Sequence, residues 1–233
     1  MRSILERVGI DEKITEIIWK EGKPVETLNK ACEEAKVDLL ILGASKNEAL
    51  FRYYIGSIAR KISRNPVCSL LLITEPNKKE SNLNNIVVTG IDHIKTKTSI
   101  KAALNFSNQF KAKEVTIVEE VKPSKVKTRI DDHNSLREAY HEKEELEKEE
   151  NKRIQNILMP LQMKGSAKIS MKCVFGKEGY SIGHFAEIWG ADLLVMNSPD
   201  KKLGFLDRFF PHDLEYVLSD MPCDLMIVHP KES

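Results

Sequence analysis

Long apolar runs are scarce in this sequence of 233 residues. The longest, such as Val37–Leu42 and Leu70–Ile73, are far shorter than the roughly 20 residues that a membrane-spanning helix needs. The start of the chain carries an acid at Glu6 and lacks the apolar stretch of a signal peptide. We therefore expect a cytoplasmic protein with no direct membrane insertion.

An excess of charge of either sign is also missing. Lys and Arg together number 36, against 35 Asp and Glu, so the formal net charge is only +1. A nearly neutral chain offers little general attraction to nucleic acid or to anionic lipid, and we expect no nucleic-acid partner. The hydrophobic fraction of 41% suffices for an ordinary globular core.

Paired cysteines and clustered histidines are absent as well. No C-x-x-C spacing occurs and the six histidines are scattered, which disfavours a zinc site. Asp131-Asp132-His133 with His141 is the nearest approach to a metal-ligand set, but it falls in a polar loop, and we predict no metal. The four cysteines are expected to be reduced thiols in core or half-buried positions: Cys32, Cys68, Cys173 and Cys223.

The chain does contain one pattern twice. Gly22 precedes a helical stretch that leads to an apolar run carrying Asp38, and Gly176 and Asp192 hold the same two positions 154 residues further on. Each copy then passes through an X-Pro step, Asn65-Pro66 or Met221-Pro222, and ends in an apolar run, Ser69–Ile73 or Leu225–Val228.

Strand and helix periodicities alternate along both copies. The first copy is predicted to contain strands at Lys13–Trp19, Val37–Leu42 and Ser69–Ile73, and helices near Met1–Val8 and at Val25–Ala35 and Gly56–Ser63. The second is predicted to contain strands at Asn85–Ile91, Glu114–Val121, Ala167–Val174, Ala191–Asn197 and Leu225–Val228, a helix at Ser99–Phe110, and a long helix from a capping box at Ser135–Glu138 to Pro160. Alternation of this kind predicts an α/β fold with a mainly parallel sheet. Trp19 and Trp189 are expected to anchor the core.

One constellation in the first copy has the residues of a phosphate cradle. Gly43 follows a buried strand, where ligands usually bind in open α/β sheets, and Gly56-Ser57 opens a helix. Glycine lets backbone N–H groups approach a phosphate closely, and a helix N-terminus adds partial positive charge. Lys46, Arg52 and Arg60 would add full charges. A plain turn followed by a helix cap explains the same spacing, and the spacing alone favours this simpler explanation.

These motifs resemble those of the universal stress protein family. Its ATP-binding pattern is Gly, two residues, Gly, nine residues, Gly and then Ser or Thr, and Gly43, Lys46, Gly56 and Ser57 match it with Lys46 in place of the second glycine. The resemblance implies a parallel five-stranded sheet sandwiched by helices, of the adenine-nucleotide alpha-hydrolase-like type, and ATP or another adenine nucleotide as cofactor. The implied binding residues are Gly43, Ser45, Lys46, Gly56, Ser57 and Asp92.

The second copy departs from the family pattern at the phosphate cradle. Asn197 stands where Gly43 does, Asp200 where Lys46 does, and His212-Asp213 where Gly56-Ser57 do. Acids beside a triphosphate weaken binding, so we predict that this cradle is lost. Asp92, at the end of the copy's first strand, matches the aspartate with which the family contacts adenosine.

The resemblance also divides the chain. Residues 1–76 correspond to the carboxyl-terminal part of a unit, residues 77–84 to a linker, and residues 85–230 to a complete unit. In the family strand order 3-2-1-4-5, the first copy lacks the two strands between its third and fourth, which leaves apolar edges open. We expect the chain to be part of a longer protein, and its last strands to pair antiparallel with each other or in self-association.

The expected function is a non-catalytic stress-response or signalling module that binds, or formerly bound, an adenine nucleotide and acts on an unknown protein partner. The alternative is a cytoplasmic regulatory domain of a longer membrane transporter. ATP hydrolysis is disfavoured because no general base or metal-binding acid adjoins Gly56-Ser57 in the sequence.

Overall fold

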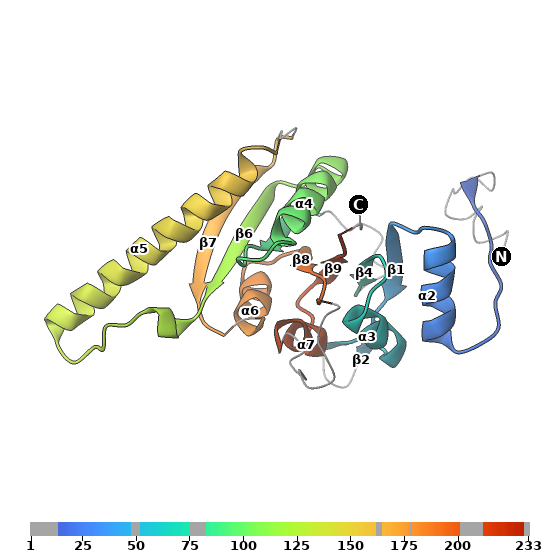
Figure 1. Ribbon diagram of the computed structural model, residues 1–233, viewed down its shortest axis with the longest axis horizontal. Coiled ribbons are helices and arrows are strands. Elements are labelled where there is room, and N and C mark those ends of the chain that lie inside the picture. Colours follow the sequence, from blue (N-terminus) through green and yellow to red (C-terminus); the bar gives the residue numbers. More distant parts are fainter. Residues whose placement is uncertain are drawn as a thin grey trace.

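A computed structural model describes residues 14–47, 52–74, 83–161, 165–177, 179–200 and 212–230. The helix predicted near residues 1–8 and most of the linker lie outside these residues. The elements, labelled in Figure 1, are α2 (Pro24–Glu34), β1 (Leu39–Gly43), β2 (Ser45–Asn47), β3 (Arg52–Tyr54), α3 (Ser57–Arg64), β4 (Ser69–Ile73), β5 (Asn85–Thr89), α4 (Thr96–Phe110), β6 (Glu114–Val121), η2 (Pro123–Lys125), α5 (His133–Leu158), β7 (Lys168–Phe175), α6 (Tyr180–Ile188), β8 (Leu193–Asn197), α7 (His212–Ser219) and β9 (Asp224–Val228).

A seven-stranded sheet in the order β1-β4-β9-β8-β5-β6-β7 forms the centre of the molecule. The last five strands are the second copy in the predicted order 3-2-1-4-5, all parallel, and this prediction is confirmed. Two cores lie on opposite faces of the sheet. One packs α3, α6 and α7 with part of α2, and the other packs α4 and the end of α5.

The two copies are joined by their last strands. β4 and β9 pair antiparallel, with Leu70 opposite Ile227 and Leu72 opposite Leu225, and all four side chains are fully buried. The predicted antiparallel pairing of the last strands is confirmed, and it occurs within one chain. Since β1 and β8 occupy the other edges of these strands, neither is available for pairing with another chain, and self-association through them loses its basis.

The amino-terminal part of the first copy differs from the prediction. Residues Thr15–Trp19, expected in a strand, form none, and Ile14 lies in a 3-10 turn. A strand needs a neighbouring strand to satisfy its backbone, and no described residue offers one there. Trp19 is 79% exposed instead of buried. Trp189 is also exposed, at 39%, and stacks on Phe185 with ring centroids 5.5 Å apart.

The N-cap of the long helix α5 lies three residues before the predicted one. Asp132 is the N-cap and accepts a hydrogen bond from the Ser135 backbone N–H at 2.8 Å, while the Ser135 hydroxyl reaches back to the Asp132 backbone N–H. Ser135 thus occupies the N3 position of the capping box and not the N-cap position. The predicted cap was wrong because aspartate at Asp132 satisfies the free helix N–H groups at least as well as serine does.

Glu120, near the end of β6, stabilises the start of α6. Its carboxylate accepts hydrogen bonds from the backbone N–H groups of Gly179 at 3.0 Å and Ile182 at 2.8 Å. The side chain is 5% exposed, so these bonds are shielded from water. A carboxylate at a helix N-terminus also interacts favourably with the helix dipole.

Replacing Glu120 with alanine should therefore lower the free energy of unfolding by about 1–2 kcal/mol, the usual cost of losing a helix cap. Urea denaturation followed by circular dichroism measures the change. Glu149→Ala, an exposed glutamate of α5, is the matched control and should change stability by less than about 0.5 kcal/mol. Equal effects of the two substitutions would show that Glu120 does not cap α6.

Candidate nucleotide sites at the two edges of the sheet

The residues of the predicted phosphate cradle lie together at the carboxyl end of β1. Gly43 is the last residue of that strand, and Gly56 is the N-cap of α3. The segment between them includes a two-stranded hairpin, β2 with β3, in which Ser45 pairs with Tyr54 and Lys46 with Tyr53. The side chains of Ser45 and Lys46 lie outside the described part of the structure.

Open space adjoins both glycines of this cradle. A Cβ atom built on Gly43 or Gly56 would meet no heavy atom within 4 Å, and neither residue has a positive φ. Gly56 has φ −60° and ψ 155°, and no side chain caps the helix at this residue. The chain's own packing and backbone geometry therefore do not require glycine at either position. A remaining reason for glycine at these two positions is that it lets a ligand approach the backbone closely.

The cationic side chains proposed for this cradle are only partly available to it. Arg60 donates to the Glu215 carboxylate at 3.3 Å and to the Leu218 carbonyl at 3.2 Å, so it links α3 to α7. Arg64 donates to the same carboxylate at 2.6 Å, and this bond raises the pKa of Arg64. Arg60 therefore contributes to the joint between the units and not to a phosphate site, contrary to the prediction. The side chain of Arg52 is not described.

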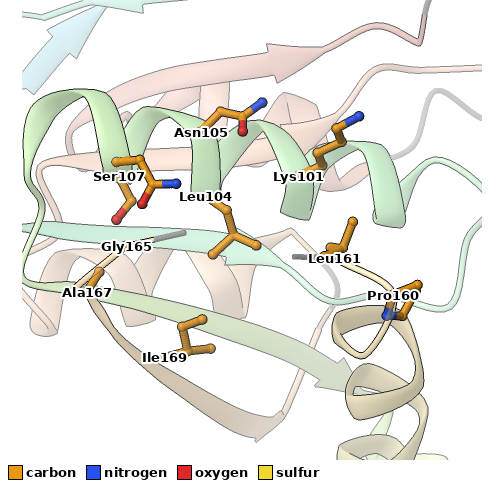
Figure 2. Close-up of a pocket in the computed structure, with 10 residues that line it drawn as sticks. Lys101, Leu104, Asn105, Ser107, Pro160, Leu161, Gly165, Ala167 and Ile169 are labelled. Carbon is orange, nitrogen blue, oxygen red and sulfur yellow. The ribbon is translucent and has the colours of Figure 1, made fainter. Parts of the chain in front are cut away.

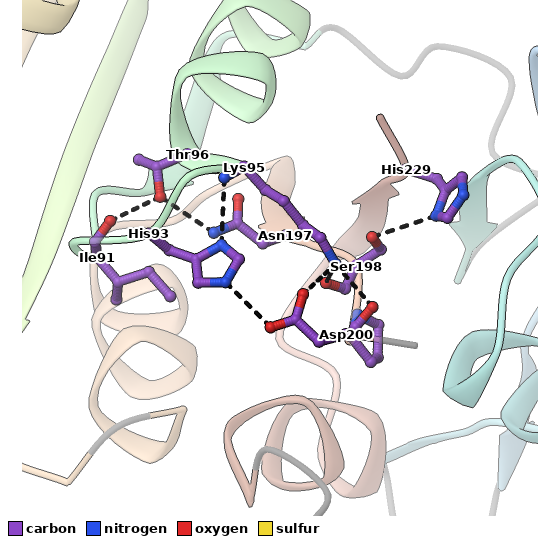
Figure 3. Close-up of polar contacts among 9 residues, drawn as sticks. Ile91, His93, Lys95, Thr96, Asn197, Ser198, Asp200 and His229 are labelled. Atoms are coloured by element: carbon purple, nitrogen blue, oxygen red, sulfur yellow. Dashed lines mark hydrogen bonds and ion pairs between the residues drawn. The ribbon is translucent and has the colours of Figure 1, made fainter. Parts of the chain in front are cut away.

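The corresponding edge of the second copy is filled by polar contacts, shown in Figure 3. Asn197, at the end of β8, donates to the Thr96 hydroxyl at 3.1 Å (Figure 3). It also accepts a hydrogen bond from the Ser99 hydroxyl at 2.6 Å. The Thr96 hydroxyl donates in turn to the Ile91 carbonyl at 2.6 Å. These bonds hold the loop after β5 against the end of β8, as the family resemblance predicts for neighbouring first and fourth strands.

Asp200 contacts two basic side chains at this end of the strands, Lys95 and His93. Its carboxylate lies 2.6 Å from the Lys95 Nζ and 3.2 Å from the His93 Nε2 (Figure 3). Lys95 also donates to the carbonyls of Ser198 at 2.9 Å and Pro199 at 2.8 Å. The bond from Lys95, and then that from His93, lower the pKa of Asp200. The Asp200 carboxylate thus already contacts Lys95 and His93, the side chains that would otherwise donate to a bound phosphate.

Asp92 lies in the loop after β5, as predicted, and is exposed. The structure does not bring it to the first copy's cradle. Because β4 and β9 are antiparallel, the carboxyl ends of β1 and β4 lie at one end of the strands, and those of β5 and β8 lie at the other end. The six predicted site residues therefore form two separate groups, with Asp92 in one and the two glycines Gly43 and Gly56 in the other.

A buried contact between an arginine and a glutamate near Asp92 was not anticipated from the sequence. Arg153 of α5 contacts the Glu119 carboxylate at 2.6 Å and also donates to the Gly90 carbonyl. Glu119 is 5% exposed, and burial raises its pKa to about 8 against the opposing effect of Arg153. The available signal was the pair Glu119-Glu120 inside the otherwise apolar run of β6, since acids in a buried strand need partners.

A cavity of about 290 Å³ lies between α4, the end of α5 and the start of β7 (Figure 2). Its lining includes Leu104, Leu161 and Ile169, with Lys101 at the same wall. Among the residues that the structure describes, the buried Ser107 hydroxyl has no hydrogen-bond partner. The cavity is near the amino end of β7, the strand at the opposite end of the sheet order from β1.

Three further observations bear on metal sites, membrane insertion and thiols. Among the described residues, no group of three or more metal-ligating side chains comes together. Within the same part of the chain, no helix combines the length and apolarity needed to cross a bilayer. All four cysteines are free thiols, with Cys32, Cys68 and Cys223 buried and Cys173 half-buried.

Comparison with known proteins decides the family. The sequence profile of the universal stress protein family matches residues 3–74 and 85–229. The chain belongs to the universal stress protein family. The second of these two segments contains β5 to β9, the five parallel strands of the sheet.

Individual relatives agree with this assignment. A universal stress protein of Methanocaldococcus jannaschii is 30% identical over 59 residues, which are 25% of this chain and 35% of the relative, so the match spans about a third of that protein. Two solved structures share the fold. A putative universal stress protein from Pseudomonas aeruginosa has a TM-score of 0.65 at 13% identity, covering 97% of this chain and 76% of that one. A universal stress protein from Archaeoglobus fulgidus has a TM-score of 0.63 at 13% identity, covering 99% and 73%.

Proposed function

We propose that this universal stress protein is a non-catalytic binding module whose first unit holds the phosphates of an adenine nucleotide, with ATP as the first candidate. The cradle consists of the backbone around Gly43 and Gly56-Ser57 at the carboxyl end of β1. The observation that carries the proposal is the open space at both glycines, at positions where neither packing nor φ requires a glycine. The N–H groups at the start of α3 would donate to the phosphate oxygens.

The contrast between the two units supports this choice of site. At the second unit's edge, Lys95 and His93 already contact Asp200. A phosphate there would have to displace this carboxylate and would be repelled by it. We therefore assign no phosphate-binding role to Asn197–Asp200. Signalling would then consist of a nucleotide-dependent change in the first unit that a protein partner reads.

ATP at 100 times its dissociation constant should stabilise the fold by about 2.7 kcal/mol, because a ligand that binds only the folded state shifts unfolding by mass action. A thermal melt of the purified chain at rising ATP concentration measures this as an increase in Tm. Gly56→Asp should abolish the increase, since it places a carboxylate at the helix N-terminus where the phosphates would bind. Gly56→Ala, which adds no charge, should reduce the increase without removing it.

Two results would contradict the proposal. No rise in Tm at any ATP concentration would identify a chain that binds no nucleotide. A rise that survives Gly56→Asp and is lost in Asp92→Ala would move the site to the second unit. Chromatographic analysis of the same ATP samples tests the non-catalytic part, because formation of ADP in step with protein concentration would indicate hydrolysis.

A further inference from the structure

The second unit shows how its fourth strand, β8, is enclosed. β5 pairs in parallel with its outer edge, with Ile86 opposite Leu193 and Val88 opposite Val195. Helix α4 then covers one face of the same strand, and Leu193 and Val195 are almost completely buried in the core that α4 helps to form. A strand followed by a helix thus closes both the edge and the face.

The equivalent strand of the first unit, β1, lacks both covers among the described residues. β1 is the end strand of the sheet, and Ile41, which corresponds to Val195 in the repeat, is 54% exposed. Leu39 and Leu71 pack against the core on the α4 side of the sheet, which places Ile41, two residues from Leu39 along the strand, on that face. The opposite face of β1 is packed normally, since Leu40 and Leu42 contact the core around α3.

The backbone at this edge is available for pairing. The Ser69 N–H donates to the Asp38 carbonyl and the Ala44 N–H to the Ile73 carbonyl, so the even-numbered residues of β1 direct their backbone groups towards β4. Because these groups alternate along a strand, those of Leu39, Ile41 and Gly43 point outward. An outward row of donors and acceptors on an apolar strand is a template for another strand.

We propose that this edge and face of β1 bind a β-strand and the helix that follows it, supplied by a partner polypeptide. The strand would be apolar and parallel to β1, in the register that β5 has on β8, and the helix would be amphipathic and would lie over Ile41. This mode is β-strand addition, in which main-chain bonds provide affinity and the helix buries the exposed face. The proposal does not depend on nucleotide binding.

A strand–helix element fits better than a second copy of this chain. Two copies joined edge to edge through β1 would pair their outward backbone groups but would leave the face of Ile41 uncovered. Two copies packed face to face would cover Ile41 and leave both edges open. The matches to the two solved relatives cover 97% and 99% of this chain but 76% and 73% of those chains. About a quarter of each relative therefore lies beyond the part of the fold that this chain reproduces.

The test uses the full chain and a synthetic peptide of its residues 83–112, which contain β5 and α4 and serve as a probe of the right chemistry. We expect saturable binding of one peptide per chain, with amide exchange at Ile41 slowed about tenfold or more in the complex. Ile41→Pro should abolish binding, because proline removes an outward N–H that takes no part in the β4 ladder. Ile41→Asp should weaken binding about tenfold or more by placing a charge under the helix.

Ile188→Asp is the matched control, because Ile188 is 73% exposed on α6 and far from β1 in the sheet order. It should bind the peptide as the unmodified chain does. Circular dichroism verifies folding of each variant, and the two aspartate variants decide the question if Ile41→Pro does not fold. Unchanged exchange at Ile41 with saturating peptide would overturn the proposal. So would protection of Ile41 that rises with protein concentration without peptide, because a second copy would then occupy the edge.

Discussion

Replacing Leu225 with alanine should lower the free energy of unfolding by about 2–5 kcal/mol, the range for large-to-small changes at fully buried sites. Leu225 is completely buried in β9, between Leu72 of β4 and Leu194 of β8. It therefore contacts both units at once. Urea denaturation should show one transition that moves to lower concentration for the whole chain, because the units share a sheet and a core.

The control for this substitution is Leu136→Ala, at a half-buried position on α5, which should cost less than about 1 kcal/mol. Amide exchange at Leu42 and Ile117 reports on the first and second unit separately. If Leu225→Ala accelerated exchange at Ile117 and left Leu42 unchanged, the units would be independently stable and the shared core would not couple them.

Glu119→Gln should remove most of a pH dependence of stability that the unmodified chain shows between pH 6 and pH 8. Burial raises the pKa of Glu119 to about 8, so the folded chain keeps this proton while the unfolded chain loses it above about pH 4.5. Stability from this group is therefore highest near pH 4.5 and falls as the pH rises towards 8. The expected loss from pH 6 to pH 8 is about 2 kcal/mol.

Urea midpoints at several pH values measure this slope in both proteins, and the six histidines cancel in the comparison. Glu149→Gln, at an exposed position, should leave the slope unchanged. The opposite sign is also informative. Stability that rises with pH in the unmodified chain, and not in Glu119→Gln, would show that Arg153 holds the carboxylate charged and that its pKa is lowered.

Much of the fold follows from local pattern, and the failures have physical causes. The strand Ser69–Ile73 was predicted to the residue because its continuous apolar run is buried in the middle of a sheet. The strand predicted at Lys13–Trp19 is not found at Thr15–Trp19, because a strand requires a neighbouring strand and no described residue supplies one. The predicted N-cap of α5 was wrong because both Asp132 and Ser135 can cap a helix, and the sequence alone does not rank them.

The candidate site was less predictable than the fold. Spacing located Gly43 and Gly56 at one edge correctly, since carboxyl ends of parallel strands meet there. It did not reveal that Asp92 lies at the other edge, because that depends on the direction in which β4 meets β9. The contact of Lys95 and His93 with Asp200 was also missed, since it joins residues more than a hundred positions apart in the chain.

Because β4 and β9 pair antiparallel, the carboxyl end of β1 and the carboxyl end of β8 lie on opposite sides of the molecule. A body bound at the end of β1 and another bound at the end of β8 would face away from each other, held apart by the length of the strands. They would not compete for space, so both would be carried at once. Any influence of one on the other would have to pass through the contacts between the units, which include the pairing of Leu70–Leu72 with Leu225–Ile227 and the bonds from Arg60 and Arg64 to Glu215.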